Sequence, residues 1–363
     1  MGDNMVVRLK TIFIVTAALT VAFLLFWFSE SVREGVKNGI ALCLETVIPS
    51  LFLFTALTIF SLKSGLIAAL GKILDPFSRL CFDLSGEQFS VMLASFISGY
   101  PVGARLISEL YKSNRVSEKK AKQMLDFCVC AGPGFVVLAV GEGSLFSRAD
   151  GYRLLIAHIL SAFFMAIFSR FSNKSKTENA PKQQLVTSAP LSLAFTESVC
   201  DAARTMLSVS AFVVAFSGLG GIVSNFQSAT PIISKTFQAV LEVTVGIGLF
   251  GRKQLPIIAF LLGFGGISVH FQVLSSIREL HYPYYRLLLS RTVHGTLSFG
   301  MIVLMELISP RVIDTALVSP SVTPKVHGSP AATIALLCLG VVLIFYCSAT
   351  KTKKCGNSEK DMV

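Results

Sequence analysis

Long apolar runs separated by short polar segments make up most of this chain. Residues 11–28 carry no charge and are long enough to begin crossing a hydrocarbon core of roughly 30 Å. That run ends in aromatic residues suited to a membrane interface, whereas a signal peptide ends in small residues, so a retained helix is predicted. Residues 31–44 mix charged and apolar positions at helical spacing and predict an amphipathic helix at the interface. Further spanning helices are predicted over residues 45–62, 152–171, 206–226, 232–250, 285–308 and 331–348.

Two glycine-rich segments interrupt apolar sequence, at residues 98–104 and 263–270, and each is followed by a helix-like run. A broken backbone in hydrocarbon persists only where protein or a water-filled cavity satisfies its polar groups. A third apolar run, 124–146, is divided by Gly-Pro-Gly at 132–134. Matched interruptions in the two halves of a membrane protein point to a transport site. The sequence therefore predicts an all-α, polytopic transmembrane helical bundle with two pseudo-repeats and broken or re-entrant helical hairpins.

Two weak internal matches indicate a repeat. Gly99 corresponds to Gly265 at an offset of 166 residues, and Tyr-Arg-Leu-Leu at 152–155 recurs at 285–288, an offset of 133. The two offsets differ by about the length of residues 118–150, so the first repeat is predicted to hold one extra broken hairpin. The predicted organisation is an N-terminal transmembrane helix (1–30), a first repeat with the extra hairpin (31–171), a polar linker (172–190), a second repeat (191–308), and a loop, last transmembrane helix and basic tail (309–363).

Composition and charge agree with a membrane protein. Hydrophobic residues make up 53% of the 363 positions and charged residues only 15%, whereas soluble proteins carry about 25% charged residues. The net charge of +11 comes from basic clusters at the ends of apolar runs and not from one basic stripe. This distribution follows the positive-inside rule, so the predicted partner is the lipid bilayer and not nucleic acid.

The sidedness of the broken segments has two solutions. Both termini are predicted to be cytoplasmic, because basic clusters lie near each of them. The other basic clusters also follow the positive-inside rule if both broken segments re-enter from the cytoplasmic face. An inverted repeat, which is common in transporters, would place them on opposite faces instead. The sequence leaves this choice open.

The first broken segment offers groups that could hold an anion. Gly99 and Gly103 allow close backbone approach, and Pro101 frees a carbonyl of the preceding turn. Amides at the start of the following helix, together with Tyr100 and the charge of Arg105, would form a substrate site. The alternative is a helix kink with small-residue packing.

The second broken segment brings polar side chains to membrane depth. Ser268 and Gln272 are four residues apart and share one helix face, whereas His270 points elsewhere and is expected to pack. His158 and His294 lie on spanning helices and are also expected to pack. The candidate substrate-binding residues are Gly99, Tyr100, Pro101, Gly103, Arg105, Gly132, Pro133, Gly265, Gly266, Ser268 and Gln272.

Ionisable and reactive residues suggest ion coupling but not catalysis. Glu142, Glu242 and Glu306 lie in apolar surroundings, where they could couple transport to protons or sodium or could lie at an interface; Glu142 and Glu242 are the preferred candidates. Cys128 and Cys130 have no third ligand nearby in the sequence, so no metal site is predicted. The sequence has no His-Glu-x-x-His, P-loop or Gly-x-Ser-x-Gly signature, and neither enzyme activity nor a cofactor is predicted.

The chain closely resembles the YlbJ/SpoVV sporulation integral membrane proteins, which carry a nucleoside-recognition, or gate, domain. The resemblance rests on Ser-Gly-Tyr-Pro-Val-Gly-Ala-Arg at 98–105, Phe-Cys at 127–128, Gly-Pro at 132–133 and Gly-Phe-Gly-Gly-Ile-Ser-Val-His-Phe-Gln-Val-Leu-Ser at 263–275. It covers roughly residues 31–308, which makes both repeats gate-like. The resemblance implies a relative of concentrative nucleoside transporters that moves dipicolinic acid across the outer forespore membrane during spore formation.

Dipicolinate is a small planar dianion, and the candidate site suits it. Arg105 and helix-end amides would bind a carboxylate, and Tyr100, Ser268 and Gln272 would orient the ring. The competing hypothesis is a membrane scaffold or sensor whose gate domain binds a ligand without moving it.

Two departures from the family pattern widen the choice of cargo. Family members often have one or more Asn after the Phe-Cys pair, where this chain has Val129 and Cys130. The run at 241–244 is often followed by Asn-Gly, but here by Val245-Gly246. Loss of these amides leaves a nucleoside-like or another anionic cargo open.

Overall fold

The computed structural model describes residues 2–172 and 190–311. These residues form helices throughout, and no strand occurs among them, which confirms the predicted all-α fold. The predicted linker, last transmembrane helix and basic tail lie outside the described residues. The segments long and apolar enough to cross a membrane are Ser29–Lys63, Arg148–Phe171, Leu191–Ser224, Arg252–Ser276 and Tyr284–Ile308. The protein is therefore a multi-pass membrane protein.

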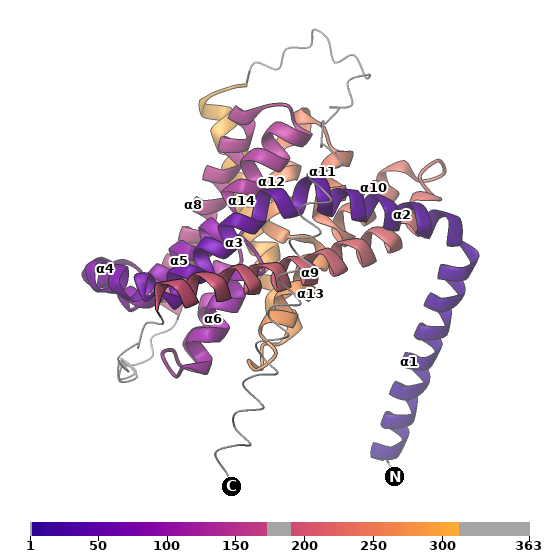
Figure 1. Cartoon of the computed structure of the whole chain (residues 1–363). Coiled ribbons are helices and arrows are strands. Elements are labelled where there is room, and N and C mark those ends of the chain that lie inside the picture. The colour runs from indigo at the N-terminus through magenta and orange to yellow at the C-terminus, as the bar shows by residue number, and fades with distance from the viewer. Residues whose placement is uncertain (1, 173–189, 312–363) are drawn as a thin grey trace.

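Figure 1 shows the course of the chain through these elements. In chain order they are α1 (Gly2–Trp27), α2 (Ser29–Leu42), η1 (Cys43–Val47), α3 (Ile48–Lys63), α4 (Leu66–Phe82), α5 (Gly86–Ser98), α6 (Val102–Lys112), α7 (Glu118–Cys128), η2 (Gly134–Ser144), α8 (Arg148–Ser172), α9 (Leu191–Ser224), α10 (Pro231–Leu241), α11 (Val243–Leu249), η3 (Arg252–Gln254), α12 (Leu255–Phe264), α13 (Gly266–Ser276) and α14 (Tyr284–Ile308).

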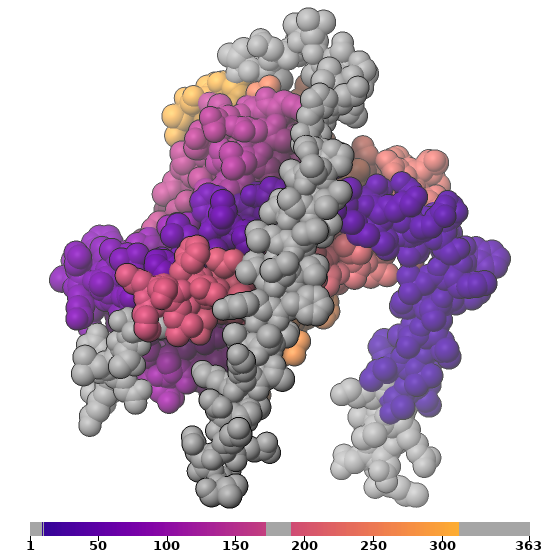
Figure 2. Space-filling view, viewed as in Figure 1, coloured from indigo at the N-terminus to yellow at the C-terminus, as the bar shows by residue number. Residues whose placement is uncertain are grey.

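The N-terminal helix α1 stands apart from the rest of the described protein (Figure 2). Its apolar side chains are open, with Phe13 74% and Phe26 81% exposed. Such a surface suits contact with lipid acyl chains.

A long scaffold is formed by α2, η1 and α3, which run on as one helical segment and pack against α9. At one end Lys63 Nζ lies 2.8 Å from a carboxylate oxygen of Glu197. A Cβ on Gly35 would lie 2.4 Å from the carbonyl oxygen of Ser217, so α2 and α9 are in backbone contact. The amphipathic pattern of α2, read from the sequence as an interfacial helix, therefore includes a face that packs on α9.

Two helical hairpins fold back on themselves. In α5–α6, a Cβ on Gly103 would lie 2.5 Å from the Cβ of Ser95. In α10–α11, a Cβ on Gly246 would lie 2.5 Å from the Cα of Ala239. We call residues 99–101, between α5 and α6, tip 1, and residues 242–244, at the turn from α10 into α11, tip 2.

The second hairpin corrects the predicted spanning helix over residues 232–250. Glu242 divides that run because its backbone is extended, with φ −141° and ψ 118°. Its carboxylate accepts the Val245 N–H at 2.8 Å and so caps the start of α11. The apolar run is thus a hairpin and not one helix.

Two further helices cross the protein with an interruption in each. Residues 129–133, which we call break 1, separate α7 from η2, and Gly265, which we call break 2, separates α12 from α13. Gly265 has φ +85°, a left-handed conformation that ends α12 and that glycine adopts at little cost.

The two hairpins enter from opposite faces of the bundle. At the end of α6, Lys112 Nζ lies 3.2 Å from Glu279 Oε1, near the end of α13. Beyond α11, Arg252 Nε lies 2.9 Å from Asp150 Oδ2 at the start of α8. We call these the Lys112 face and the Asp150 face; α6 lies toward the bottom of Figure 1 and the yellow end of α14 at the top. Of the two broken segments predicted from the sequence, 98–104 lies in a re-entrant hairpin, whereas 263–270 interrupts a helix that runs from the Asp150 face to the Lys112 face. The two segments therefore do not both re-enter from one face.

A repeat with an offset of 133 residues would pair the breaks differently from the sequence prediction. The helices α8 and α14 are antiparallel, since Arg153 at the start of α8 donates to the carbonyl oxygen of Ser309 after α14. Gly132 in break 1 and Gly265 in break 2 differ by 133 residues, the same offset as the Tyr-Arg-Leu-Leu match. Apart from α2–α4 in the first half and α9 in the second, each half then holds one hairpin, one interrupted helix and one further spanning helix. With this pairing the first half needs no extra hairpin, because Glu242 marks a second-half tip that lacks glycine and proline.

This arrangement predicts that a loop on each face is labelled from a different side of the membrane. We expect Ser113→Cys on the Lys112 face and Lys253→Cys on the Asp150 face to react with an impermeant maleimide from opposite sides of sealed vesicles. Both positions are exposed. A background lacking reactive native cysteines serves as control, and labelling of both positions from one side would contradict the inverted hairpins.

Candidate functional site

The two tips and the two interrupted helices meet at one cavity, whose empty volume, including space open to solvent, is about 390 Å³. Its walls come from elements far apart in the sequence. The lining residues are Gly99 and Tyr100 of tip 1, Ala131 and Gly132 of break 1, Phe135 of η2, Glu242, Val243 and Thr244 of tip 2, Val269 and Gln272 of α13, Val47 and Leu51 of the scaffold, and Val209 and Val213 of α9.

Each tip makes direct backbone contact with a break. A Cβ on Gly99 would lie 2.8 Å from the amide nitrogen of Gly132, and Gly99 itself has φ +79°. A Cβ on Gly266, beside break 2, would lie 3.1 Å from the amide nitrogen of Val243. Only glycine permits such approaches. The pairs tip 1 with break 1 and tip 2 with break 2 therefore form the two halves of the site.

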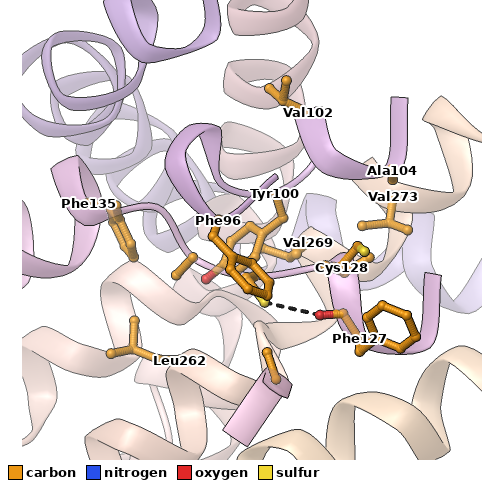
Figure 3. Close-up of a cluster of buried hydrophobic side chains, with 14 of the residues drawn as sticks. Phe96, Tyr100, Val102, Ala104, Phe127, Cys128, Phe135, Leu262, Val269 and Val273 are labelled. Atoms are coloured by element: carbon orange, nitrogen blue, oxygen red, sulfur yellow. Dashed lines mark hydrogen bonds between the residues drawn. The ribbon is translucent and has the colours of Figure 1, made fainter. Parts of the chain in front are cut away.

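Tyr100 lines the cavity and has a polar group without a partner in the described part of the chain. Figure 3 shows its ring beside Phe96 and Val269 in the buried cluster. The residue is 9% exposed, and its hydroxyl has no hydrogen-bond partner among the described groups. A buried hydroxyl without a partner costs stability, so Tyr100 is the lining group best placed to gain from a polar ligand.

Thr244, Glu242 and Gln272 are further polar residues of the lining, and Thr244 Oγ1 donates to Glu242 Oε1 at 3.3 Å. Glu242 is 2% exposed, and its carboxylate accepts the Val245 N–H in the first turn of α11. Gln272 Nε2 donates to Ser268 Oγ at 3.2 Å, which leaves the side-chain oxygen Oε1 of Gln272 for another donor. The side chains of Glu242 and Gln272 can therefore exchange or add a partner when a ligand enters.

The structure brings only part of the predicted site together. Of the predicted residues, those lining the cavity are Gly99, Tyr100, Gly132, Gln272 and the coupling candidate Glu242. The residues Pro101, Gly103, Pro133, Gly265, Gly266 and Ser268 lie in or beside the tips and breaks and shape the backbone behind the lining.

The charged candidates Arg105 and Glu142 lie elsewhere. Arg105 Nη1 donates to Thr205 Oγ1 at 2.9 Å, and its Nη2 lies 3.3 Å from Asp201 Oδ1, so its charge is used in holding α6 to α9. Glu142 is paired with Arg148 at 2.6 Å on the Asp150 face.

A buried polar cluster behind break 1 was missed by the sequence analysis. Arg291 of α14 donates to the carbonyl oxygens of Asp126 and Val129, where α7 ends. The Ala131 N–H donates to His158 Nε2 at 2.8 Å. An arginine inside an apolar spanning helix was the available signal.

This cluster includes three groups at metal-ligand spacing. Ligand atoms of Cys130, His158 and His294 all lie within 4.8 Å of one another. Arg291 donates to His294 Nδ1 at 3.2 Å, which requires the proton of that ring on Nε2, where it donates to the His158 carbonyl oxygen at 3.0 Å. Both nitrogens of His294 are thus engaged beside a buried cation, so we assign the cluster a structural role.

The carbonyl ends at the two breaks are satisfied from inside the protein. At break 1 Arg291 binds the end of α7, and at break 2 His270 Nε2 lies 2.9 Å from the Phe264 carbonyl oxygen at the end of α12. By contrast, the amide ends of α6, η2 and α13 have no side-chain cap. Uncapped helix N-termini carry partial positive charge, so the polarity of the site favours a negative group.

His158 is expected to stabilise break 1. Replacing it with phenylalanine leaves the buried Ala131 N–H without its acceptor, at a cost of about 1–3 kcal/mol. The melting temperature of the purified protein in detergent should fall accordingly. His281→Phe is the matched control, because its side chain is 95% exposed. Equal melting temperatures for the two variants would contradict this role.

Comparison with known proteins agrees with the predicted resemblance. The Gate family model, described as nucleoside recognition, matches residues 44–175. The chain is 22% identical to the sporulation integral membrane protein YlbJ of Bacillus subtilis strain 168, over 82% of this chain and 83% of that protein. It is also 30% identical to an uncharacterized protein of Methanocaldococcus jannaschii, over 25% of this chain and 29% of that protein. No solved structure gives a significant match.

Proposed function

We propose that this multi-pass membrane protein, which carries a nucleoside-recognition Gate domain and is similar to a sporulation integral membrane protein, transports a small anionic metabolite. The observation that carries the proposal is one cavity lined by both hairpin tips and both interrupted helices. Irregular backbone at membrane depth is expected where a transporter binds its cargo. Because the hairpins enter from opposite faces, displacement of one or the other would open the cavity to either side.

An anionic cargo is supported by the polarity of the cavity. The uncapped amide ends of α6, η2 and α13 favour negative charge, and the unpartnered Tyr100 hydroxyl can donate a hydrogen bond. Gln272 adds an amide that can accept or donate. From the family resemblance we propose dipicolinate as the cargo, delivered to the developing spore.

The ionisation state of Glu242 decides whether a dianionic cargo can bind in the cavity. It is the acid that lines the cavity, and a dianion beside an ionised, buried carboxylate is strongly repelled. We propose that Glu242 carries a proton when the cargo is bound, so that the coupling ion is the proton. Glu142, exposed and paired with Arg148, is left without this role.

The proposed orientation rests on the basic residues of the Lys112 face. Around the end of α6 and the start of α7 these are Lys112, Arg115, Lys119, Lys120 and Lys122. By the positive-inside rule we propose that this face, and both termini, are cytoplasmic. The membrane would be the outer forespore membrane if the cargo is dipicolinate.

The test is uptake of labelled dipicolinate by the purified full-length protein in liposomes. A transporter accumulates label inside, and excess unlabelled dipicolinate abolishes the signal. Saturable binding without uptake would favour the alternative of a membrane sensor or scaffold. If the protein neither binds nor takes up dipicolinate, dipicolinate is rejected as the cargo.

A nucleoside-like cargo is the second candidate. Glu242 and Gln272 are hydrogen-bonding partners that a neutral base and sugar could use without charge repulsion, and the matching family model is described as nucleoside recognition. The same assay separates the candidates, because labelled uridine would be taken up and would be displaced by other nucleosides but not by dipicolinate.

A further inference from the structure

Arg291 is a buried cation without an ion-pair partner. It is 1% exposed, and its guanidinium donates to the carbonyl oxygens of Asp126 and Val129. Its Nε has no hydrogen-bond partner, and within the described residues no carboxylate oxygen lies within 4 Å of its nitrogens. An isolated charge at this depth is costly unless something compensates it.

The neighbouring acid does not neutralise Arg291. The Asp126 carboxylate is bound by Arg286 Nη2 at 2.6 Å and by the Tyr282 hydroxyl at 2.5 Å. The remaining titratable groups around Arg291 are the thiols of Cys128 and Cys130, the imidazoles of His158, His270 and His294, and the hydroxyl of Tyr100. His294 accepts a hydrogen bond from Arg291 and is therefore uncharged on that nitrogen.

The charge of Arg291 lies directly behind the wall of the cavity. The Arg291 guanidinium donates a hydrogen bond to the carbonyl oxygen of Val129 at the start of break 1, and Ala131 and Gly132 of the same break line the cavity. Glu242 of tip 2 also lines the cavity, so the cavity has a positive group behind break 1 and an acidic group at tip 2.

We propose that Arg291 is the residue that makes the cavity select an anion, acting through break 1 and without touching the cargo. Holding two carbonyl groups does not require a charge, because neutral donors can do the same. The positive charge itself is explained if a carboxylate of the cargo, bound beside Tyr100 and break 1, compensates it. This proposal rests on the proposed function and assigns to Arg291 the role that the sequence suggested for Arg105.

The test compares equilibrium binding of dipicolinate with that of its neutral diamide, measured by calorimetry on the purified full-length protein in detergent. We expect the wild type to prefer the dianion by at least about tenfold. Arg291→Gln should bring this ratio close to one, whereas R291K should keep the preference even if both affinities fall. The matched control is R286Q on the same helix, which removes an arginine already paired with Asp126 and should keep the wild-type ratio.

A purely structural role gives a different result. If R291Q weakens both compounds equally, or if the wild type shows no preference for the dianion, the proposal is overturned. R291H provides a second neutral replacement at high pH if R291Q does not fold, and it should likewise lose the preference. Preferential dipicolinate binding without liposome uptake would reject the transporter and leave the role of Arg291 standing.

Discussion

Gly132→Val is expected to abolish cargo uptake, lowering the initial rate by about a hundredfold, while the protein still inserts in the membrane. A Cβ at this position would lie 2.9 Å from the carbonyl oxygen of Ile97 and 3.0 Å from the amide nitrogen of Gly99. Both neighbours are backbone atoms and cannot rotate away. The side chain would therefore push tip 1 away from break 1 and distort the cavity between them. The measurement is initial uptake of labelled dipicolinate per mole of reconstituted protein.

The control for this variant is another glycine in a spanning helix. A Cβ on Gly300 of α14 meets nothing within 4 Å, so Gly300→Val should transport at close to the wild-type rate. Comparable melting temperatures would show that both variants are folded. Normal uptake by Gly132→Val would mean that contact between tip 1 and break 1 is not needed for transport.

Glycine and proline allowed three of the four interruptions to be predicted from the sequence. Gly99, Gly132 and Gly265 each stand in an apolar run, and each marks a place where the backbone leaves a helix. The fourth interruption, at Glu242, was predicted as part of a spanning helix. Its extended backbone depends on the carboxylate cap of α11 and on the approach of Gly266, and neither has a pattern in the local sequence.

The charges of the site were harder to predict than its backbone. Arg105 adjoins the first glycine motif in the sequence, but Asp201 on α9 engages its side chain away from the cavity. Arg291 lies 162 residues from Val129, to which it donates, and only the packing of α14 against α7 brings them together. Periodicity locates helices and their interruptions, whereas contacts between distant helices depend on how they pack. The sequence therefore located the cavity more reliably than it identified the cation beside it.

Glu242→Gln is expected to remove the response of uptake to a pH gradient. In the wild type a dianionic cargo binds together with a proton on Glu242, so uptake should rise as the pH falls on the loading side. By thermodynamic reciprocity, cargo and proton each raise the affinity for the other, by up to about tenfold per pH unit. Glutamine resembles the protonated acid and keeps the hydrogen-bonding shape of tip 2 without binding a proton. The variant should equilibrate cargo across the membrane but not accumulate it.

Accumulation in liposomes with an alkaline interior, measured with and without the gradient, tests this expectation. Glu142→Gln is the matched control, since that carboxylate is paired with Arg148 and lies outside the cavity lining; it should keep the full response. Accumulation driven by the gradient in Glu242→Gln would show that another group carries the proton. If uptake by the wild type is driven by sodium and does not respond to pH, Glu242 keeps only its role as the cap of α11. A carboxylate that stays ionised beside a dianion would oppose cargo binding at every pH.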